Sequence, residues 1–140
     1  MAGRLRRIFG GSPERLEISQ ALGAFARPGE GDISPLHVFF EVANVGDEAV
    51  EITTLFVAPK GSSRPVHEGP FGGDGPLPLV LPPGGSARFH THARSLAQDL
   101  REAGHGGRPK VRLVVEDASE ERFEKAFRFR VDEYLRLKDE

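Results

Sequence analysis

The feature that most constrains the fold is an alternation of apolar and polar residues with a period of two. It is clearest in PLHVFFEVANVG, where Leu36, Val38, Phe40 and Val42 fall on one face. Successive side chains of a β-strand point to opposite faces, so this run predicts a strand with one buried face. Comparable runs recur at short spacing from ERLEISQAL to RFEKAFRFRV, about seven in all.

A single segment departs from this period and reads as a helix. RSLAQDLREAG carries apolar residues at i, i+4 and i+7, which is the spacing of a core-facing helical stripe. Ser95, with Gln98 three residues later, has the pattern of a capping box. Gly104 is placed for the left-handed C-cap. We therefore expect one short helix near residues 95–103, crossing from one sheet to another.

These elements predict an all-β fold, because strands never alternate with helices as they do in parallel sheets. The expected architecture is a two-sheet antiparallel sandwich of about seven strands with that one short helix. We place this domain at residues 14–131. Residues 1–13 are expected to be a flexible basic arm, and residues 132–140 a charged tail.

Two motifs resemble those of bacterial immunoglobulin-like modules of the CARDB-like or fibronectin-like kind. The first is FFEVANVGDEAVEITTLFVAP, an apolar strand that ends in Asn44-Val45-Gly46 before a second β-branched strand. The second is LPPGGSARF, a proline-glycine turn that leads into the next strand. The resemblance implies an immunoglobulin-like sandwich, and it implies that the chain serves as an interaction or spacer domain.

Composition excludes several classes of function. The chain has 140 residues, 38% of them hydrophobic and ten of them Phe, which is enough for one core. Because the net charge is −2, we expect no nucleic-acid partner. The absence of Cys excludes disulfides and thiolate chemistry. No apolar run approaches the roughly 20 residues of a membrane span, and no secretory signal is evident, so we expect a soluble, cytoplasmic protein. A bacterial source is what the resemblance implies.

Two histidines in SARFHTHA are the strongest candidates for site chemistry. In a strand, His90 and His92 point the same way, about 7 Å apart, and could share a metal ion with a third ligand. His37, His67, His105 and Glu41 could supply that ligand from other segments. Arg88 falls on the same face as the pair and would repel a dication. We therefore expect a solvated face with no metal and no cofactor, and keep metal binding as an alternative.

No catalytic motif accompanies these histidines. The glycine-rich stretch GPFGGDG has no Lys-Ser/Thr of a phosphate loop, and Gly-x-Ser-x-Gly does not occur. Acid pairs such as Glu120-Glu121 fall in a turn. We expect the protein not to be an enzyme.

Several apolar residues fall on the strand faces expected to point outward, with arginines at their rim. Such a patch suits a protein partner or self-association, unless another segment of the chain covers it. The candidate partner-binding residues are Phe39, Leu55, Val57, Val114, Arg112, Arg128 and Arg130. Because both alternating sets of the strand that carries Leu55 and Val57 are apolar, their neighbours Thr54 and Phe56 could face outward in their place.

The function expected from the sequence is thus a non-enzymatic module for protein–protein interaction or self-association. One alternative is a metal-binding sandwich that uses His90 and His92. Another is a membrane-associated module, in which the basic arm with Arg4, Arg6 and Arg7 touches an anionic membrane surface.

Overall fold

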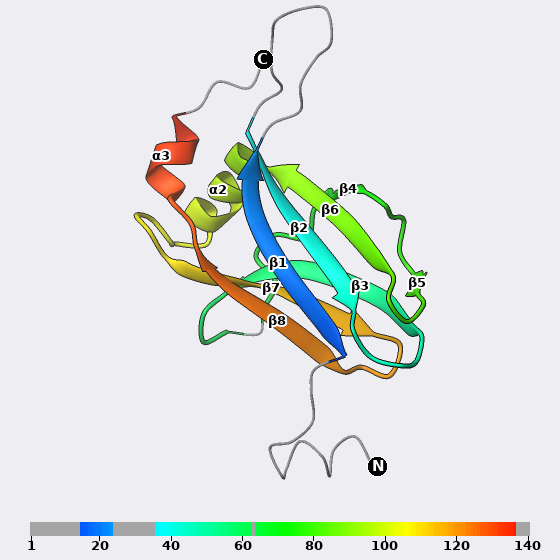
Figure 1. The fold of residues 1–140 in the computed structure, drawn as a ribbon. Coiled ribbons are helices and arrows are strands. Elements are labelled where there is room, and N and C mark those ends of the chain that lie inside the picture. The colour runs from blue at the N-terminus through cyan, green and yellow to red at the C-terminus, as the bar shows by residue number, and fades with distance from the viewer. Residues whose placement is uncertain (1–14, 24–35, 63, 137–140) are drawn as a thin grey trace, which may run out of the picture.

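A computed structural model describes residues 15–23, 36–62 and 64–136 of the chain. Eight strands and two helices follow one another along these segments, and the strands form two stacked layers (Figure 1). The elements are β1 (Leu16–Gly23), β2 (His37–Asn44), β3 (Val50–Pro59), β4 (Gly72–Gly73), β5 (Leu79–Leu81), β6 (Ser86–His92), α2 (Ala93–Glu102), β7 (Lys110–Asp117), β8 (Arg122–Arg128) and α3 (Val131–Leu135).

The strands confirm the predicted two-sheet antiparallel sandwich. One sheet has the order β1-β2-β6-β4 and the other β5-β3-β7-β8, and every pairing is antiparallel. If β5 is set aside and the other seven strands are lettered A to G in chain order, the two sheets have the orders A-B-E-D and C-F-G of the immunoglobulin arrangement. Strand β5 is then an additional strand beside β3. The strand that the sequence did not predict is β4, which has only two residues. It lies within the long proline- and glycine-rich loop between β3 and β5.

The apolar face predicted for β2 lies in the core between the sheets. Val38, Phe40 and Val42 are fully or almost fully buried, and Phe40 packs edge-on against Phe127 of the other sheet, with ring centroids 5.7 Å apart. Burying a side chain of this size contributes about 1.5–3 kcal/mol. The alternation read from the sequence is therefore the alternation that builds the core.

Strand β3 corrects two of the predicted surface residues. Leu55 and Val57 belong to the core between the sheets and do not lie on the outer face. The reason is a β-bulge: Ile52 pairs with Asp117, but Thr54 pairs with the adjacent Glu116, so Thr53 is an extra residue. An extra residue reverses which positions face inward, so Ile52 before the bulge and Leu55 and Val57 after it all reach the core, while Phe56 and Ala58 form a separate cluster on the outer face.

Helix α2 crosses from the sheet of β6 to the sheet of β7, as expected. It begins at Ala93, two residues before Ser95, and no side chain caps it. The capping-box prediction is therefore wrong, because β6 runs directly into the helix and Ser95 already lies in its first turn. The C-cap prediction is confirmed: Gly104 has a φ of +93°, and its amide donates to the Arg101 carbonyl.

The short helix α3 packs against α2, beyond the boundary that we placed at residue 131. Val131 and Tyr134 are buried in the core, and burial raises the pKa of the Tyr134 hydroxyl. Arg101 of α2 pairs with Asp132 of α3, and the hydrogen bond from Arg101 lowers the pKa of the Asp132 carboxyl. The first part of the predicted tail is thus attached to the sandwich.

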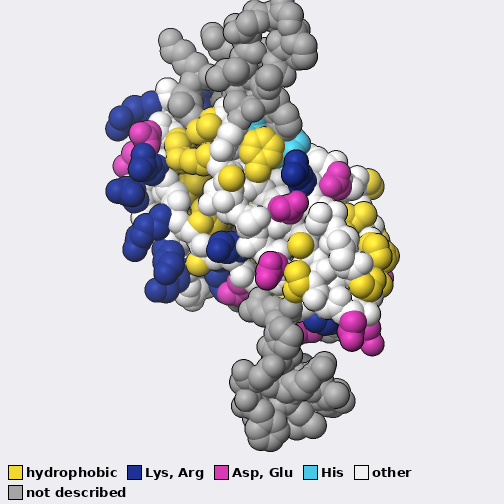
Figure 2. Space-filling view, in the orientation of Figure 1, with side chains coloured by type: hydrophobic (Ala, Val, Ile, Leu, Met, Phe, Trp, Pro, Cys, Tyr) yellow, Lys and Arg dark blue, Asp and Glu magenta, His cyan; other side chains and the backbone are white. Residues whose placement is uncertain are grey.

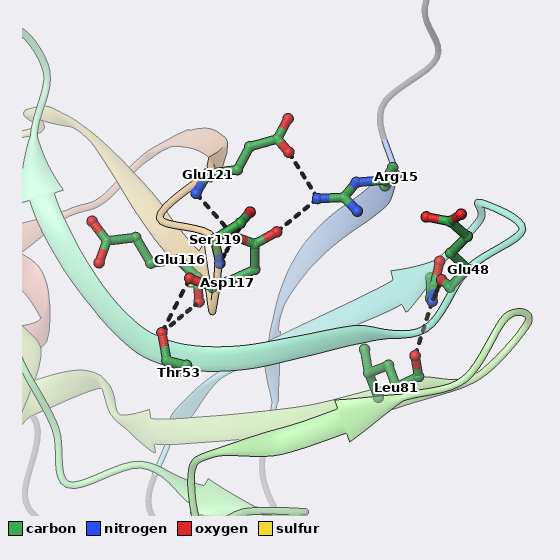
Figure 3. Close-up of polar contacts among 9 residues, drawn as sticks. Arg15, Glu48, Thr53, Leu81, Glu116, Asp117, Ser119 and Glu121 are labelled. Atoms are coloured by element: carbon green, nitrogen blue, oxygen red, sulfur yellow. Dashed lines mark hydrogen bonds and ion pairs between the residues drawn. The ribbon is translucent and has the colours of Figure 1, made fainter. Parts of the chain in front are cut away.

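Two buried polar side chains organise the turns at one end of the sandwich (Figure 3). The amide of Asn44 donates to the carbonyls of Glu48 and Leu81, at 2.8 and 2.9 Å, and its oxygen accepts the Gly46 amide. Asn44 is therefore the physical basis of the Asn-x-Gly motif. In the β7–β8 turn, Asp117 accepts from Ser119 and Glu121, while Arg15 reaches it from the start of β1 at 2.7 Å.

Candidate functional site

Three histidines and one phenylalanine gather on the outer face of the sheet β1-β2-β6-β4. The β2–β6 register sets His37 directly opposite His92, and Phe39 opposite His90. The His37 ring centroid lies 4.4 Å from that of His92 and 5.4 Å from that of His90. The sequence did not decide which residue could supply a third ligand, and the structure places His37 beside the pair. We call His37, His90 and His92 the histidine group.

The histidine group lies in a partly desolvated setting. His37 is buried, while His90 is partly buried against Phe39 and over Gly72 of β4. A β-carbon on Gly72 would clash with the His90 ring, so glycine is needed there. Burial lowers the pKa of His90, and the charges of His37 and His92 lower it further. The site therefore disfavours an additional proton.

The donor atoms of this group are not arranged around a metal ion. Within residues 15–23, 36–62 and 64–136, no group of three or more His, Cys, Asp or Glu side chains has the geometry to hold one. Arg88, which we expected to repel a dication, lies on the same face and pairs with Glu41 at 3.7 Å. The rings of His90 and His92 therefore contact that of His37, but the three rings do not surround a common position for an ion.

A second polar cluster lies inside the molecule, where the long loop meets β6 and α2. His67 is completely buried; its Nδ1 lies 2.6 Å from a carboxylate oxygen of Asp99, and its Nε2 lies 2.8 Å from the Thr91 hydroxyl. Backbone bonds from Val66 and His67 to Val57 attach the same loop to β3. Val57 and His67 thus form an isolated antiparallel bridge.

The order carboxylate–imidazole–hydroxyl is also that of hydrolase triads. Here, however, Thr91 is only 3% exposed, and its hydroxyl lies 3.3 Å from the Pro70 carbonyl. A nucleophile must reach its substrate, whereas this hydroxyl is enclosed by the core and the loop. The cluster therefore joins the loop, β6 and α2 through satisfied buried hydrogen bonds.

The remaining apolar candidate, Val114, lies on the outer face of the sheet β5-β3-β7-β8, where other residues of the chain bury it. Val114 does point outward, but it is completely buried in a small cluster with Phe56 and Ala58. The Arg122 guanidinium lies over the Phe56 ring, 5.8 Å from its centroid. The prediction of an exposed apolar patch at Val114 is wrong, because Val114 is buried in its cluster with Phe56 and Ala58, and Arg122 lies over Phe56.

The arginines predicted at the rim of that patch differ in their surroundings. Arg112 is mostly buried, where it pairs with Glu124 and donates to the Ser62 carbonyl. Arg130 is exposed and pairs with Glu133 at 3.2 Å. Arg128 is exposed, and its guanidinium donates to the backbone carbonyl of Arg108, at 3.3 Å.

Arg128 is one of four exposed cations that gather at one end of β7 and β8. Lys110 is its direct cross-strand partner, and the Lys60 amide donates to the Lys110 carbonyl at 3.0 Å. We call Lys60, Arg108, Lys110 and Arg128 the basic group. In the described part of the chain, none of the four pairs with a carboxylate, whereas Arg112 and Arg122 on the same face both do.

Figure 2 shows Lys and Arg side chains collected along the side of the molecule where Figure 1 draws β8 and the loop before β7. Sequence reasoning named Arg128 but missed Lys60, Arg108 and Lys110. The sequence could have indicated Lys110, because the turn sequence DASEE at residues 117–121 is centred on Ser119. A hairpin with that centre places Lys110 opposite Arg128. The contribution of Lys60 depends on a contact between distant segments, which the sequence pattern does not show.

No protein-family model matches this chain, and no curated protein does either. Among solved structures, it is similar to a FixG-related protein from Vibrio parahaemolyticus, with 13% identity, a TM-score of 0.37, and coverage of 80% of this chain and 94% of that one. It is also similar to the Northeast Structural Genomics Consortium target SoR45, with 13% identity, a TM-score of 0.40, and coverage of 90% and 94%. Similarity this weak carries no argument about this chain.

The alternative of a membrane-bound module depends on residues 1–13, which lie outside the described residues. Among the helices that the structure describes, none has the length and apolar character needed to cross a bilayer.

Proposed function

We propose that this chain is a non-enzymatic immunoglobulin-like module that binds an acidic protein partner through the basic group. The observation that supports this most is the direct cross-strand pairing of Lys110 with Arg128, with no carboxylate beside them in the described residues. Like charges directly opposite each other destabilise a sheet. An acidic ligand would remove that repulsion, so free energy lost in the isolated fold is regained on binding.

The contrast with the rest of the same face supports a local role for this group. Arg112 is paired with Glu124, and Arg122 with Glu116, so the outer face of β7 and β8 is otherwise neutralised. The whole chain has a net charge of −2, so the excess of cations is confined to one end. An anionic surface of limited extent, such as an acidic protein segment, fits this distribution better than a nucleic acid does.

The strand order supports the immunoglobulin-like part of the proposal, and modules of that architecture mostly serve interactions. Fold alone does not establish a role, so the proposal depends on the basic group. The proposal keeps three expectations from the sequence: a bacterial source, a cytoplasmic location and no cofactor.

A labelled acidic peptide tests the proposal by fluorescence anisotropy. The matched variants are Arg128→Glu, within the basic group, and Arg88→Glu, on the outer face of the other sheet, since both change the net charge equally. We expect Arg128→Glu to weaken binding about tenfold or more, because like-charge contacts cost several kcal/mol. Equal weakening by both variants would show that only net charge matters, and would contradict the proposal.

Metal binding by the histidine group is a second candidate, favoured by the position of His37 beside both other rings. Neutral imidazole is a common ligand of zinc and copper. Because the donors do not converge as placed, binding requires the exposed His92 ring to turn toward His37. Calorimetric titration with zinc tests this: heat that disappears in His37→Ala supports it, and no heat at micromolar zinc ends it.

A further inference from the structure

The free edge of β8 carries unused main-chain hydrogen-bonding groups beside the basic group. The Asp117 amide donates to the Glu121 carbonyl and the Phe129 amide to the Pro109 carbonyl, and both pairs continue the β7–β8 register. Hydrogen-bonded pairs alternate along an antiparallel ladder, so the odd-numbered residues of β8 face β7. The amides and carbonyls of Arg122, Glu124, Ala126 and Arg128 therefore point to the opposite side.

No strand in the described part of the chain pairs with that side of β8. In Figure 1, β8 forms one margin of its sheet, and β1 diverges from it toward the end where β8 meets the segment leading to α3. Because β1 contacts β8 near its beginning, the part of this seven-residue edge toward Arg128 is the part on which another strand could form.

Lys125 limits which strand can pair there. It pairs with the core residue Leu113, so it lies on the inner face, yet it is exposed between the buried Phe123 and Phe127. A lysine on the inner face of an edge strand disfavours pairing with an apolar strand. A strand that carries a carboxylate at this position would instead neutralise it.

A second copy of the chain fits this edge poorly. Two antiparallel β8 strands that use the outward-pointing groups would be centred on residue 125, since residues 122 to 128 are symmetric about it. Such pairing sets Lys125 opposite Lys125 and Arg122 opposite Arg128. All of these contacts are between like charges, which destabilise a sheet.

We propose that the acidic partner binds as an added β-strand along the free edge of β8. This inference rests on the proposed function and specifies its geometry. Main-chain bonds to Glu124, Ala126 and Arg128 supply affinity, as in other β-augmentation complexes. Carboxylates on one face of the added strand meet Lys125, and those on the other face meet Arg128 and Lys110.

The test uses an extended peptide built from repeats of Glu-Glu-Val, which carries carboxylates on both faces of the strand, and a copy with N-methyl groups on two consecutive central residues. Methylation removes one donor from each edge of the peptide but leaves its charge unchanged. On the protein, Ala126→Pro removes an outward-pointing amide without taking a donor from the β7 ladder, and Ala126→Val is the matched control. Binding is measured by anisotropy, and amide hydrogen exchange is followed by NMR.

We expect both peptide methylation and Ala126→Pro to weaken binding at least about tenfold, which is the loss of one or two main-chain hydrogen bonds. The bound peptide should slow exchange at the amides of Glu124, Ala126 and Arg128. Unchanged affinity of the methylated peptide for the native chain would overturn the inference even if Ala126→Pro fails to fold.

The two proposals fail in different ways. If Arg128→Glu abolishes binding but methylation has no effect, the basic group binds acidic partners without strand addition. If Arg128→Glu has no greater effect than Arg88→Glu, the proposed function itself is contradicted. If the unmodified peptide does not bind the native chain, the strand-addition inference is overturned as well.

Discussion

His37 of β2 and His92 of β6 stand directly opposite each other across two paired strands, and their ring centroids lie 4.4 Å apart. His90 completes the group, 5.4 Å from His37. A proton added to His90 is disfavoured by burial and by these two neighbouring rings, so His90 links the stability of the fold to pH.

The first prediction concerns that pH dependence. The pKa of His90 in the folded chain lies below its ordinary value of 6.5, first because of burial and then because of His37 and His92. Below pH 6.5 the unfolded chain therefore binds more protons at this residue than the folded chain does. Its contribution to stability is complete above that pH and is lost as the pH falls toward the lowered pKa.

Denaturant unfolding at pH 8 and pH 5.5 measures this, and NMR titration reports His90 itself. We expect the His90 midpoint to lie below 6.5 and to rise in His37→Phe, which removes one charge but leaves the larger burial effect. A midpoint at or above 6.5 in the native chain would show that the ring is neither desolvated nor repelled.

The second prediction concerns the cluster of His67, Asp99 and Thr91. His67→Ala removes a completely buried side chain and both of its hydrogen bonds. The expected loss is roughly 2–4 kcal/mol in the free energy of unfolding, from the cavity and from the loss of the two side-chain hydrogen bonds of His67. Asp99→Asn keeps an acceptor for the ring and should cost less. Equal stability of all three proteins in urea would remove the structural role of this cluster.

The third prediction concerns Asn44, whose side chain bonds to the backbone of two turns. Asn44→Ala loses three hydrogen bonds at a residue that is 1% exposed, so we expect a loss of roughly 2–3 kcal/mol. Asn44→Asp keeps the acceptor for Gly46 but offers no donor to the carbonyls of Glu48 and Leu81. Thermal unfolding should rank the native chain above both variants; an aspartate as stable as asparagine would refute this account of the Asn-x-Gly motif.

The fourth prediction separates shielded apolar residues from exposed ones. Val114→Asp introduces a charge where the side chain is completely buried, whereas Val80→Asp changes a side chain that is 58% exposed. We expect a loss of about 3 kcal/mol or more for the first and about 0.5 kcal/mol or less for the second. Should Val114→Asp fold normally and instead disperse a dimer in light scattering, Val114 would be a contact residue after all.

The sequence predicted the sandwich because alternation with a period of two is a direct consequence of strand geometry. It gave the wrong orientation for Leu55 and Val57, because the bulge at Thr53 reverses the alternation and leaves no sign beyond two apolar sets. The helix start was displaced because Ser95 has the right residue type for a cap, while the direct passage from β6 into α2 decides where the helix begins.

The candidate sites were predictable only in part. His90 and His92 share a face by spacing alone, but the position of His37 beside them depends on how β2 and β6 align. Arg128 was named for exposure, which the structure confirms. Its neighbours in the basic group come from two other stretches of the chain, and Val114 is buried by Phe56 and Ala58 of another strand, a contact that the sequence pattern does not specify.

The most direct test of the central claim is a chemical-shift map of the isotopically labelled chain with the acidic peptide. The account predicts that the largest amide shifts fall at Lys60, Arg108, Lys110 and Arg128, that they extend along β8, and that they disappear in Arg128→Glu but persist in Arg88→Glu. Shifts centred on His37 and His90, or no shifts at all, would contradict it.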